Sequence, residues 1–343
     1  MNTPLIETRN LRKDFFVKSG PFVRPAALRA VNDVSLSLHD GETLGLAGES
    51  GSGKSTLGKL LMGLLHPDKG EILFRGKEFS GFSAKELPDF RRSVQMIFQD
   101  PYSSLNPRMR IGDIIEEPMH IHRLSTPQGR RERVVALMER VGLSAEMFTR
   151  YPHEFSGGQR QRIGIARALA VSPSLVIADE PVSALDLSIQ AQIINLLQEL
   201  KNEFSLSFLV IAHDLSVLRH VCERIAIMYL GSIVEMGKTG DVFDGFMHPY
   251  TQALISAIPN VEKVPGKSRI VLKGDIPSPL SPPPGCPFHP RCPYAIPGEC
   301  DRRLPLLEEK SPGHFAACHL SEDLFLRNRN GWSRYISATL AFD

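Results

Sequence analysis

The stretch GESGSGKS, from Gly48 to Ser55, fits the pattern G-x-x-x-x-G-K-[ST] at every fixed position. Its glycines would let backbone N–H groups turn inward onto phosphates, and a following helix would add its positive N-terminal end. The Lys54 ammonium would reach the β- and γ-phosphates, and the Ser55 hydroxyl would ligate Mg²⁺. A glycine-rich turn without function is the alternative, and it leaves the complete match unexplained. The predicted phosphate-binding residues are Gly48, Ser50, Gly51, Gly53, Lys54, Ser55 and Thr56.

Two adjacent acids, Asp179 and Glu180, follow the apolar run LVIA that ends at Ala178. An acid that leaves a buried strand beside a phosphate loop is placed to hold the Mg²⁺ shell. The next acid points elsewhere and can polarise an attacking water. Such a pair can also be a solvated strand end, but the phosphate loop in the same chain favours catalysis. These residues together predict a Mg²⁺-dependent nucleoside triphosphatase.

Strands alternating with helices are predicted to position these residues. Residues 42–47 read as an apolar strand that enters the glycine-rich turn, and leucines recur at helical spacing from Leu57 to Leu65. Residues 175–178 and 208–212 are typical of buried parallel strands, with an amphipathic helix from Ile193 to Leu200 between them. This alternation predicts an α/β sheet with catalytic loops at its strand ends.

The length and composition bound the organisation of the chain. Its 343 residues suggest about two domains, and the net charge of +2 implies neither a nucleic-acid-binding stripe nor an acidic tail. The N-terminus lacks the apolar region of a signal peptide, and no apolar run reaches the ~18 residues that a membrane span needs. We therefore expect a cytosolic chain whose cysteines are reduced unless something binds them.

Three further segments complete the predicted organisation. Residues 1 to about 40 read as short strands, and residues 108–172 as a mostly helical inserted arm. After about Asn260, proline and glycine become more frequent and the periodicity fades. We predict one domain over residues 1–260 and a small C-terminal domain over residues 261–343.

The segment FSGGQRQR, from Phe155 to Arg162, opens a predicted helix about 20 residues before Asp179. It resembles the signature motif of ABC-type ATPases, with Phe155 where Leu is usual. Other motifs of that family follow in order: Gln99 in MIFQDP matches the Q-loop, SALD ending at Asp186 matches the D-loop, and His213 matches the switch histidine. The resemblance covers roughly residues 5–260.

The resemblance implies an α/β P-loop NTPase fold of the ABC ATPase type. It further implies an N-terminal antiparallel β subdomain, an inserted helical subdomain and a small Cys/Pro-rich C-terminal extension. Two such domains would close head to tail around two ATP molecules, and His213 would hold the water of Glu180 in place. Phe15 is the candidate for stacking on adenine, with Phe16 as the fallback. The resemblance also implies that Gln99, together with Ser55 and Asp179, is a Mg²⁺ ligand. The partner subunit's γ-phosphate would meet Ser156, Gly157, Gly158 and Gln159, with Asp186 nearby.

The residues that follow the cassette resemble one subgroup of this family. The segment HPYTQAL, from His248 to Leu254, is followed by a proline-rich stretch and a group of cysteines. It resembles the extension of ATP-binding subunits from oligopeptide and dipeptide permeases, most closely the second of their two ATPases. The resemblance implies a heterodimer with a second ATPase on the cytoplasmic face of the inner membrane. Further partners would be two membrane permease subunits, contacted near Gln99 and by Tyr151 to Glu154, and indirectly an extracytoplasmic solute-binding protein. Without this context, HPY would be an ordinary turn.

Four of the five cysteines lie in the tail, separated by five, seven and seventeen residues: Cys286, Cys292, Cys300 and Cys318. A cytosolic location argues against disulfides, and inert thiols would be expected to scatter. Structural zinc usually shows short C-x₂₋₄-C pairs, which are missing here, although His289, His314 and His319 are spare ligands. Four cysteines, two of them followed by proline, also suit a [4Fe–4S] cluster. The resemblance favours the cluster over Zn²⁺, with a structural or redox-sensing role.

Two other functions compete with ATP-driven import of di- and oligopeptides. A soluble ABC ATPase acting on DNA or ribosomes would usually carry two cassettes or a long coiled coil. Here about 100 residues separate Gly48 from Ser156, and no basic patch indicates a nucleic-acid partner. The same transport engine could also serve another cargo, such as an oligosaccharide or nickel.

Overall fold

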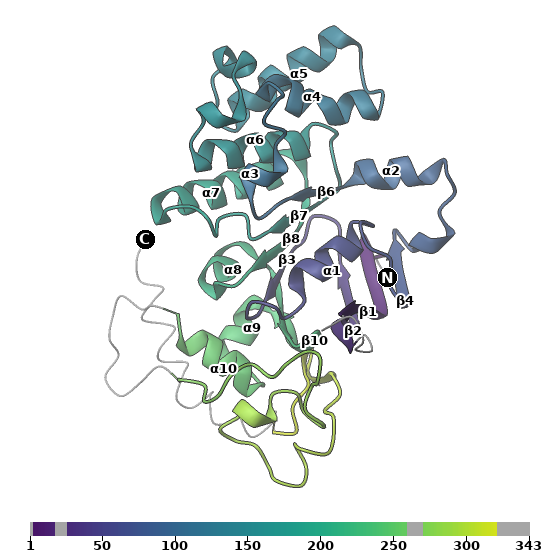
Figure 1. Ribbon diagram of the computed structural model, residues 1–343, viewed down its shortest axis with the longest axis vertical. Coiled ribbons are helices and arrows are strands. Elements are labelled where there is room, and N and C mark those ends of the chain that lie inside the picture. Colours follow the sequence, from purple (N-terminus) through teal and green to yellow (C-terminus); the bar gives the residue numbers. More distant parts are fainter. Residues whose placement is uncertain (1–2, 18–25, 259–269, 321–343) are drawn as a thin grey trace.

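The computed structural model describes residues 3–17, 26–258 and 270–320, which form two β-sheets surrounded by helices (Figure 1). The larger sheet has eight strands in the order β11-β12-β10-β9-β3-β8-β7-β6. Its parallel part comprises β3 (Thr43–Ala47), β6 (Val94–Ile97), β7 (Leu175–Asp179), β8 (Ser207–Ala212) and β9 (Arg224–Tyr229). Its antiparallel edge comprises β10 (Ser232–Lys238), β11 (Glu308–Ser311) and β12 (His314–Ala316). Every residue of β3, β7 and β8 is buried, which confirms the predicted parallel core strands.

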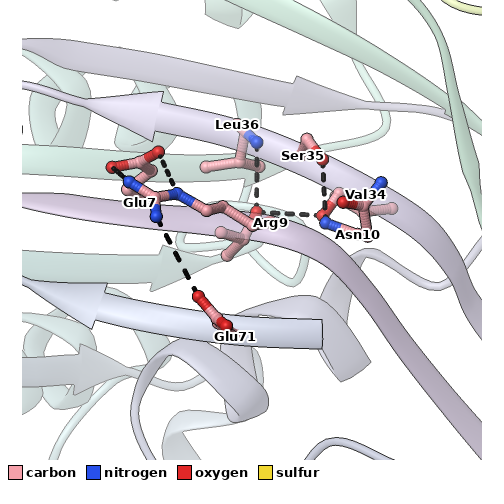
Figure 2. A network of polar contacts seen from close by, with 8 residues as sticks. Glu7, Arg9, Asn10, Val34, Ser35, Leu36 and Glu71 are labelled. Carbon is pink, nitrogen blue, oxygen red and sulfur yellow. Dashed lines mark hydrogen bonds and ion pairs between the residues drawn. The ribbon is translucent and has the colours of Figure 1, made fainter. Parts of the chain in front are cut away.

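The smaller sheet is antiparallel, as the resemblance implied. Its strands, in sheet order, are β2 (Ala26–Leu38), β1 (Ile6–Val17), β4 (Lys69–Phe74) and β5 (Lys77–Glu78). The prediction of short strands was wrong for β1 and β2, which run for 12 and 13 residues. Their hydrogen-bond register shifts between Thr8 and Leu11, where Asn10 adopts a left-handed backbone with φ 48°. Figure 2 shows how the Ser35 hydroxyl accepts the Asn10 N–H at 2.9 Å and so satisfies the donor at this bulge.

Helices cover both faces of the larger sheet. Successive residues of a strand point to opposite faces, so β8 contributes to two separate apolar cores. Helix α1 (Lys54–Leu61) packs into one core and α7 (Leu187–Phe204) into the other. The remaining α-helices are α2 (Glu86–Ser93), α3 (Pro101–Ser104), α4 (Ile111–Ile121), α5 (Pro127–Arg140), α6 (Gly157–Leu169), α8 (Leu215–Val221), α9 (Thr239–Asp244) and α10 (Pro249–Ser256). Short 3₁₀ turns are η1 (Phe79–Gly81), η2 (Ala145–Thr149), η3 (Pro152–Glu154) and η4 (His289–Arg291).

The inserted arm and the C-terminal segment lie at opposite ends of the molecule. Figure 1 shows α4, α5 and α6 at one end of the larger sheet and the yellow C-terminal segment beyond β10 at the other. This arrangement agrees with the predicted helical arm over residues 108–172. None of the helices in the described residues is long and apolar enough to cross a membrane.

The C-terminal segment, residues 270–320, joins the larger sheet through strand pairing, which the fading periodicity after Asn260 had not indicated. Strand β12 pairs with β10, where Glu235 lies opposite Ala316. The fully buried Glu235 carboxylate accepts the backbone N–H groups of Met247 and His248 and lies 2.8 Å from His314 Nε2. We call Glu235, Met247, His248 and His314 the β10 junction. The predicted domain boundary at residue 260 falls outside the described residues, and the division into two domains remains a prediction.

Candidate functional site

A cavity of about 360 Å³ opens where the phosphate loop meets both sheets. Loop and helix residues from Ser50 to Thr56 line one side of it, and Gln99 and Glu180 line another. A third side is formed by residues distant in the sequence from the loop: Phe15, Leu28, Arg29, Ala30, Leu230 and Pro279. The structure therefore brings most of the predicted phosphate and catalytic residues to one cavity.

The glycines of the loop allow close approach of backbone to backbone. Gly53 precedes α1 with φ 104°, and a Cβ at this position would lie 2.0 Å from the Ala30 carbonyl oxygen. A Cβ on Gly48, with φ 153°, would lie 2.2 Å from the Met228 carbonyl oxygen. These positions have no room for another residue type, so the loop is clamped between β2 and the end of β9.

Lys54 is 5% exposed and turns its ammonium back toward the loop. Its Nζ donates to the Gly48 carbonyl at 2.7 Å and to the Glu49 carbonyl at 3.0 Å. Burial lowers the pKa of Lys54, and the nearby charges of Glu180 and Asp179 oppose that shift. The ammonium is thus held at the wall of the cavity, in a position to meet phosphate oxygens.

Ser55 and Asp179 form the pair predicted to bind Mg²⁺. The Ser55 hydroxyl donates to Asp179 Oδ1 at 3.0 Å, which joins the start of α1 to the end of β7. Burial raises the pKa of Asp179, and the hydrogen bond from Ser55 opposes this. A hydroxyl and a carboxylate side by side are hard oxygen donors, and they suit the few protein ligands that Mg²⁺ takes beside phosphate.

Glu180 is the point on which the other predicted catalytic residues converge. Gln99 Nε2 donates to Glu180 Oε2 at 2.8 Å, and His213 Nδ1 lies 3.6 Å from the same oxygen. Glu180 itself has a left-handed backbone with φ 46°, an uncommon conformation for a residue with a side chain. The structure thus places Gln99 against the acid predicted to polarise water, and its role as a Mg²⁺ ligand remains a prediction.

The two candidates for stacking on adenine differ in position. Phe15 lines the cavity, and the Lys13 ammonium lies 5.8 Å from the centre of its ring. Phe16, the fallback, is 74% exposed. The geometry therefore supports Phe15 as the base-facing residue.

The predicted signature residues form a helix cap away from this cavity. Ser156 Oγ accepts the Gln159 N–H at 3.3 Å, and Gln159 Oε1 accepts the Ser156 N–H at 3.0 Å, so the two close the start of α6 reciprocally. Gly157 and Gly158 form the first turn of that helix, and Asp186 precedes α7 with an exposed side chain. Among the described residues that line the cavity, none comes from this group.

Sequence reasoning missed the support behind the phosphate loop. Glu49 occupies a variable position of the motif, yet its carboxylate binds Arg291 and its backbone N–H binds the hydroxyl of Tyr250. Pro279 reaches the cavity from the same C-terminal segment. Two features of the sequence could have indicated this support: the charged Glu49 inside the loop motif and Arg291 inside the cysteine-rich stretch.

The four tail cysteines come together in the C-terminal segment. Cys286 and Cys300 are buried, and the Cys286 N–H donates to the Cys300 carbonyl at 2.8 Å. Burial raises the pKa of Cys292 to about 11 and that of Cys318 to about 12, and negative charge on the neighbouring thiols adds to both shifts. Within residues 3–17, 26–258 and 270–320, no group of three or more His, Cys, Asp or Glu side chains is placed to hold a metal ion.

Comparison with known proteins gives consistent matches over most of the chain. A family model described as ABC transporter matches residues 31–183, and one described as oligopeptide/dipeptide transporter, C-terminal region matches residues 234–300. The oligopeptide transport ATP-binding protein AppF of Bacillus subtilis (strain 168) is 52% identical over 92% of this chain and 97% of its own. The dipeptide transport ATP-binding protein DppF of Haemophilus influenzae is 47% identical over 92% of this chain and 97% of its own.

Solved structures match the cassette. A dimeric ATP-binding cassette in a post-hydrolysis state, bound to ADP and Pi, is 29% identical with a TM-score of 0.61 and covers 68% of this chain and 98% of its own. The protein cbiO1 of Clostridium perfringens, part of an ABC transporter complex, is 26% identical with a TM-score of 0.59 and covers 71% of this chain and 91% of its own. These matches confirm the predicted ABC ATPase fold.

Proposed function

Since the chain belongs to the ATP-binding proteins of oligopeptide and dipeptide ABC transporters, we propose that its cavity holds Mg²⁺ and ATP and that Glu180 polarises the attacking water. Hydrolysis of ATP by the chain drives peptide import. The observation that carries the site assignment is the meeting of the phosphate loop, the Ser55–Asp179 pair and the Gln99–Glu180 pair at one cavity.

Each residue around the cavity has a distinct role in this proposal. Lys54 and the loop N–H groups bind the phosphates, while Ser55 and Asp179 hold the Mg²⁺ that balances the phosphate charge. Glu180 accepts a proton from the attacking water, and Gln99 and His213 orient that water. Phe15 stacks on the base.

The position of Ser156 supports a closed dimer. In one chain the signature cap lies away from the cavity, so a second ATPase domain would have to present its own cap to the γ-phosphate. Closure would then depend on ATP, and hydrolysis would reopen the dimer. We propose that the second domain is a different ATPase chain, so that the pair is a heterodimer.

Membrane permease subunits are the expected partners of an ATP-binding subunit in a peptide importer. We propose that two of them hold the chain on the cytoplasmic face of the inner membrane and that a solute-binding protein delivers the peptide from the other side. The surface near the Q-loop supports this docking site: Tyr102 is 66% exposed and Tyr151 is 36% exposed. Arg160 lies 3.8 Å from the Tyr102 ring and joins this surface to α6, so a contact here is linked to the signature cap.

A pull-down of the full-length chain from membranes tests this assignment. Two membrane subunits and a second, different ATPase should purify with it. Recovery of a soluble homodimer alone would contradict the importer assembly, and recovery with two copies of this chain per transporter would contradict the heterodimer.

We propose that Cys286, Cys292, Cys300 and Cys318 bind a [4Fe–4S] cluster. Their gathering in one segment supports a shared ligand.

Anaerobic purification tests the cluster. The proposal expects about four irons per chain and a broad absorbance near ~400 nm, both lost in the Cys292→Ser variant. The Cys222→Ser variant is the matched control, because Cys222 is buried at the end of α8 and lies outside the group. Stoichiometric zinc without iron would establish the alternative.

A further inference from the structure

Glu49, inside the phosphate loop, is held by two residues that follow it by more than two hundred positions. Arg291 Nη1 donates to Glu49 Oε2 at 2.7 Å, and Arg291 Nη2 donates to Glu49 Oε1 at 3.0 Å. The Tyr250 hydroxyl accepts the Glu49 N–H at 2.7 Å. The guanidinium and carboxylate thus meet in the paired geometry that gives strong, directional hydrogen bonds.

The residues that hold Glu49 are themselves buried. The Arg291 side chain is 7% exposed, and its Nη1 also lies 3.5 Å from the Tyr229 hydroxyl. The rings of Tyr229 and Tyr250 are 4.7 Å apart, and both pack against Phe288, at 5.3 Å and 5.5 Å. Tyr229 on β9 and the Phe288 carbonyl, which accepts the Arg291 N–H at 3.0 Å, therefore hold Arg291 at the end of the 3₁₀ turn η4.

The same contacts lead to the phosphate-binding lysine. The Glu49 carbonyl accepts a hydrogen bond from Lys54 Nζ at 3.0 Å, so Arg291 acts on one end of Glu49 and Lys54 on the other. A loop containing three glycines has large conformational freedom. If the loop became ordered only when the nucleotide binds, the lost conformational entropy would weaken nucleotide binding. Fixing Glu49 before the nucleotide arrives removes part of that cost.

We infer that Arg291 is a positioning residue for ATP: the C-terminal segment preorganises the phosphate loop through the Arg291–Glu49 ion pair, and α10 contributes the hydrogen bond of Tyr250. The inference rests on the proposed binding of ATP in the cavity. It assigns the C-terminal segment a part in nucleotide binding that is separate from any metal held by its cysteines.

Titration of the full-length chain with a fluorescent ATP analogue and Mg²⁺ tests the inference. The Arg291→Ala variant should bind about tenfold more weakly, because coupled neighbours of this kind interact by about that factor. Its KM for ATP should rise while kcat stays within about twofold, since Glu180 is untouched. Arg302→Ala is the matched control: Arg302 lies in the same segment with a 77% exposed side chain, and the variant should bind like the wild type.

Two further variants keep the test independent of folding. Glu49→Gln removes the charge while keeping the size of the side chain, and Arg291→Lys keeps the charge while losing the fork. Glu49→Gln should weaken binding to a similar degree, the double variant Glu49→Gln/Arg291→Ala should be no weaker than the weaker single variant, and Arg291→Lys should recover part of the affinity. Melting temperatures without nucleotide identify any variant that has lost its fold.

The outcomes separate this inference from the proposed site. If Lys54→Ala binds ATP normally, the cavity is not the nucleotide site, and both proposals fail. If Lys54→Ala loses binding while Arg291→Ala matches the Arg302→Ala control, the site stands and the positioning role is overturned. Additive losses in the double variant would also overturn it, because independent effects add and coupled ones do not.

Discussion

The cavity and the β10 junction both place a carboxylate beside a histidine, but they satisfy the carboxylate in opposite ways. At the junction, Glu235 is fully buried and its two oxygens are met by two backbone N–H groups and His314. The Glu180 side chain, which lines the cavity, is 16% exposed, and the neighbouring His213 side chain is 60% exposed. The Glu235 carboxylate is closed to solvent, while Glu180 lines a cavity of about 360 Å³.

This difference separates stability from activity. A carboxylate whose partners are all internal holds elements together, and removing it leaves several buried donors without a partner. A carboxylate beside a cavity keeps capacity for a ligand or a water. Variants at the cavity should therefore change turnover with little change in folding, and variants at the junction should do the reverse.

Glu180→Gln should have the largest effect. Loss of the carboxylate proposed to polarise water should reduce ATP turnover about 10³-fold while ATP binding persists and the closed dimer accumulates. Phosphate release and size-exclusion chromatography with ATP measure the two effects. Glu203→Gln on α7, whose side chain is 37% exposed, is the control and should turn over normally. Wild-type turnover in Glu180→Gln would assign the base elsewhere.

Glu235→Ala should have the largest effect on stability. It leaves His314 and two backbone N–H groups without their acceptor in a dry interior, which should lower the free energy of unfolding by about 3–5 kcal/mol. Urea denaturation measures it. Glu308→Ala, at an exposed position of β11, serves as the control and should unfold like the wild type. If the two variants unfold alike, the β10 junction does not hold the C-terminal segment.

The junction should also respond to acid through His248. Burial lowers the pKa of His248 to about 3, and its Nδ1 accepts the Tyr250 N–H at 3.1 Å, which requires a neutral ring. In the unfolded chain the His248 ring is protonated as the pH falls below about 6.5, whereas in the folded chain it stays neutral. Its contribution to stability is therefore fully present above that pH and decreases as the pH falls. Between pH 7 and pH 5, the titration of His248 should lower the free energy of unfolding by about 2 kcal/mol.

The His248→Asn variant isolates that contribution, because asparagine can cap α10 without titrating. Its free energy of unfolding should depend less steeply on pH than that of the wild type over the same range. Equal slopes in the two proteins would assign the acid sensitivity to other groups.

Phe15→Ala should have the smallest effect. Loss of one stacking contact should weaken ATP binding about fivefold, in line with the energy of an aromatic pair. The Phe16→Ala variant is the matched control at the neighbouring position and should bind as the wild type does. A reversed result, with loss in Phe16→Ala alone, would transfer the base contact to Phe16.

The two regions were also unequally predictable from the sequence. The loop from Gly48 to Ser55 and the acids Asp179 and Glu180 are encoded locally, because fixed spacing on a strand–turn–helix already determines where their side chains lie. Those features yielded the fold class and the meeting of Ser55 with Asp179. The left-handed backbone of Glu180 has no such local signal, and the Glu180 N–H donates to a residue of another strand, the Ile211 carbonyl on β8.

The contacts of the C-terminal segment could not be predicted in the same way. Arg291 is 242 positions from Glu49, and β12 has three residues, too few to show alternation. Their placement depends on which surfaces remain open after the cassette has folded. Glu235 on β10 and His314 on β12 become recognisable as a pair only when that packing is known.

The distance between Glu49 and Arg291 along the chain has a consequence during synthesis. The phosphate loop leaves the ribosome long before Arg291 and β12 do, and domains form from the N-terminus onward. A growing or truncated chain therefore carries every cassette motif while its phosphate loop still lacks the ion pair with Arg291. Under the inferred role of Arg291, full nucleotide affinity would arrive only with the C-terminal segment, and an unfinished subunit would bind ATP more weakly.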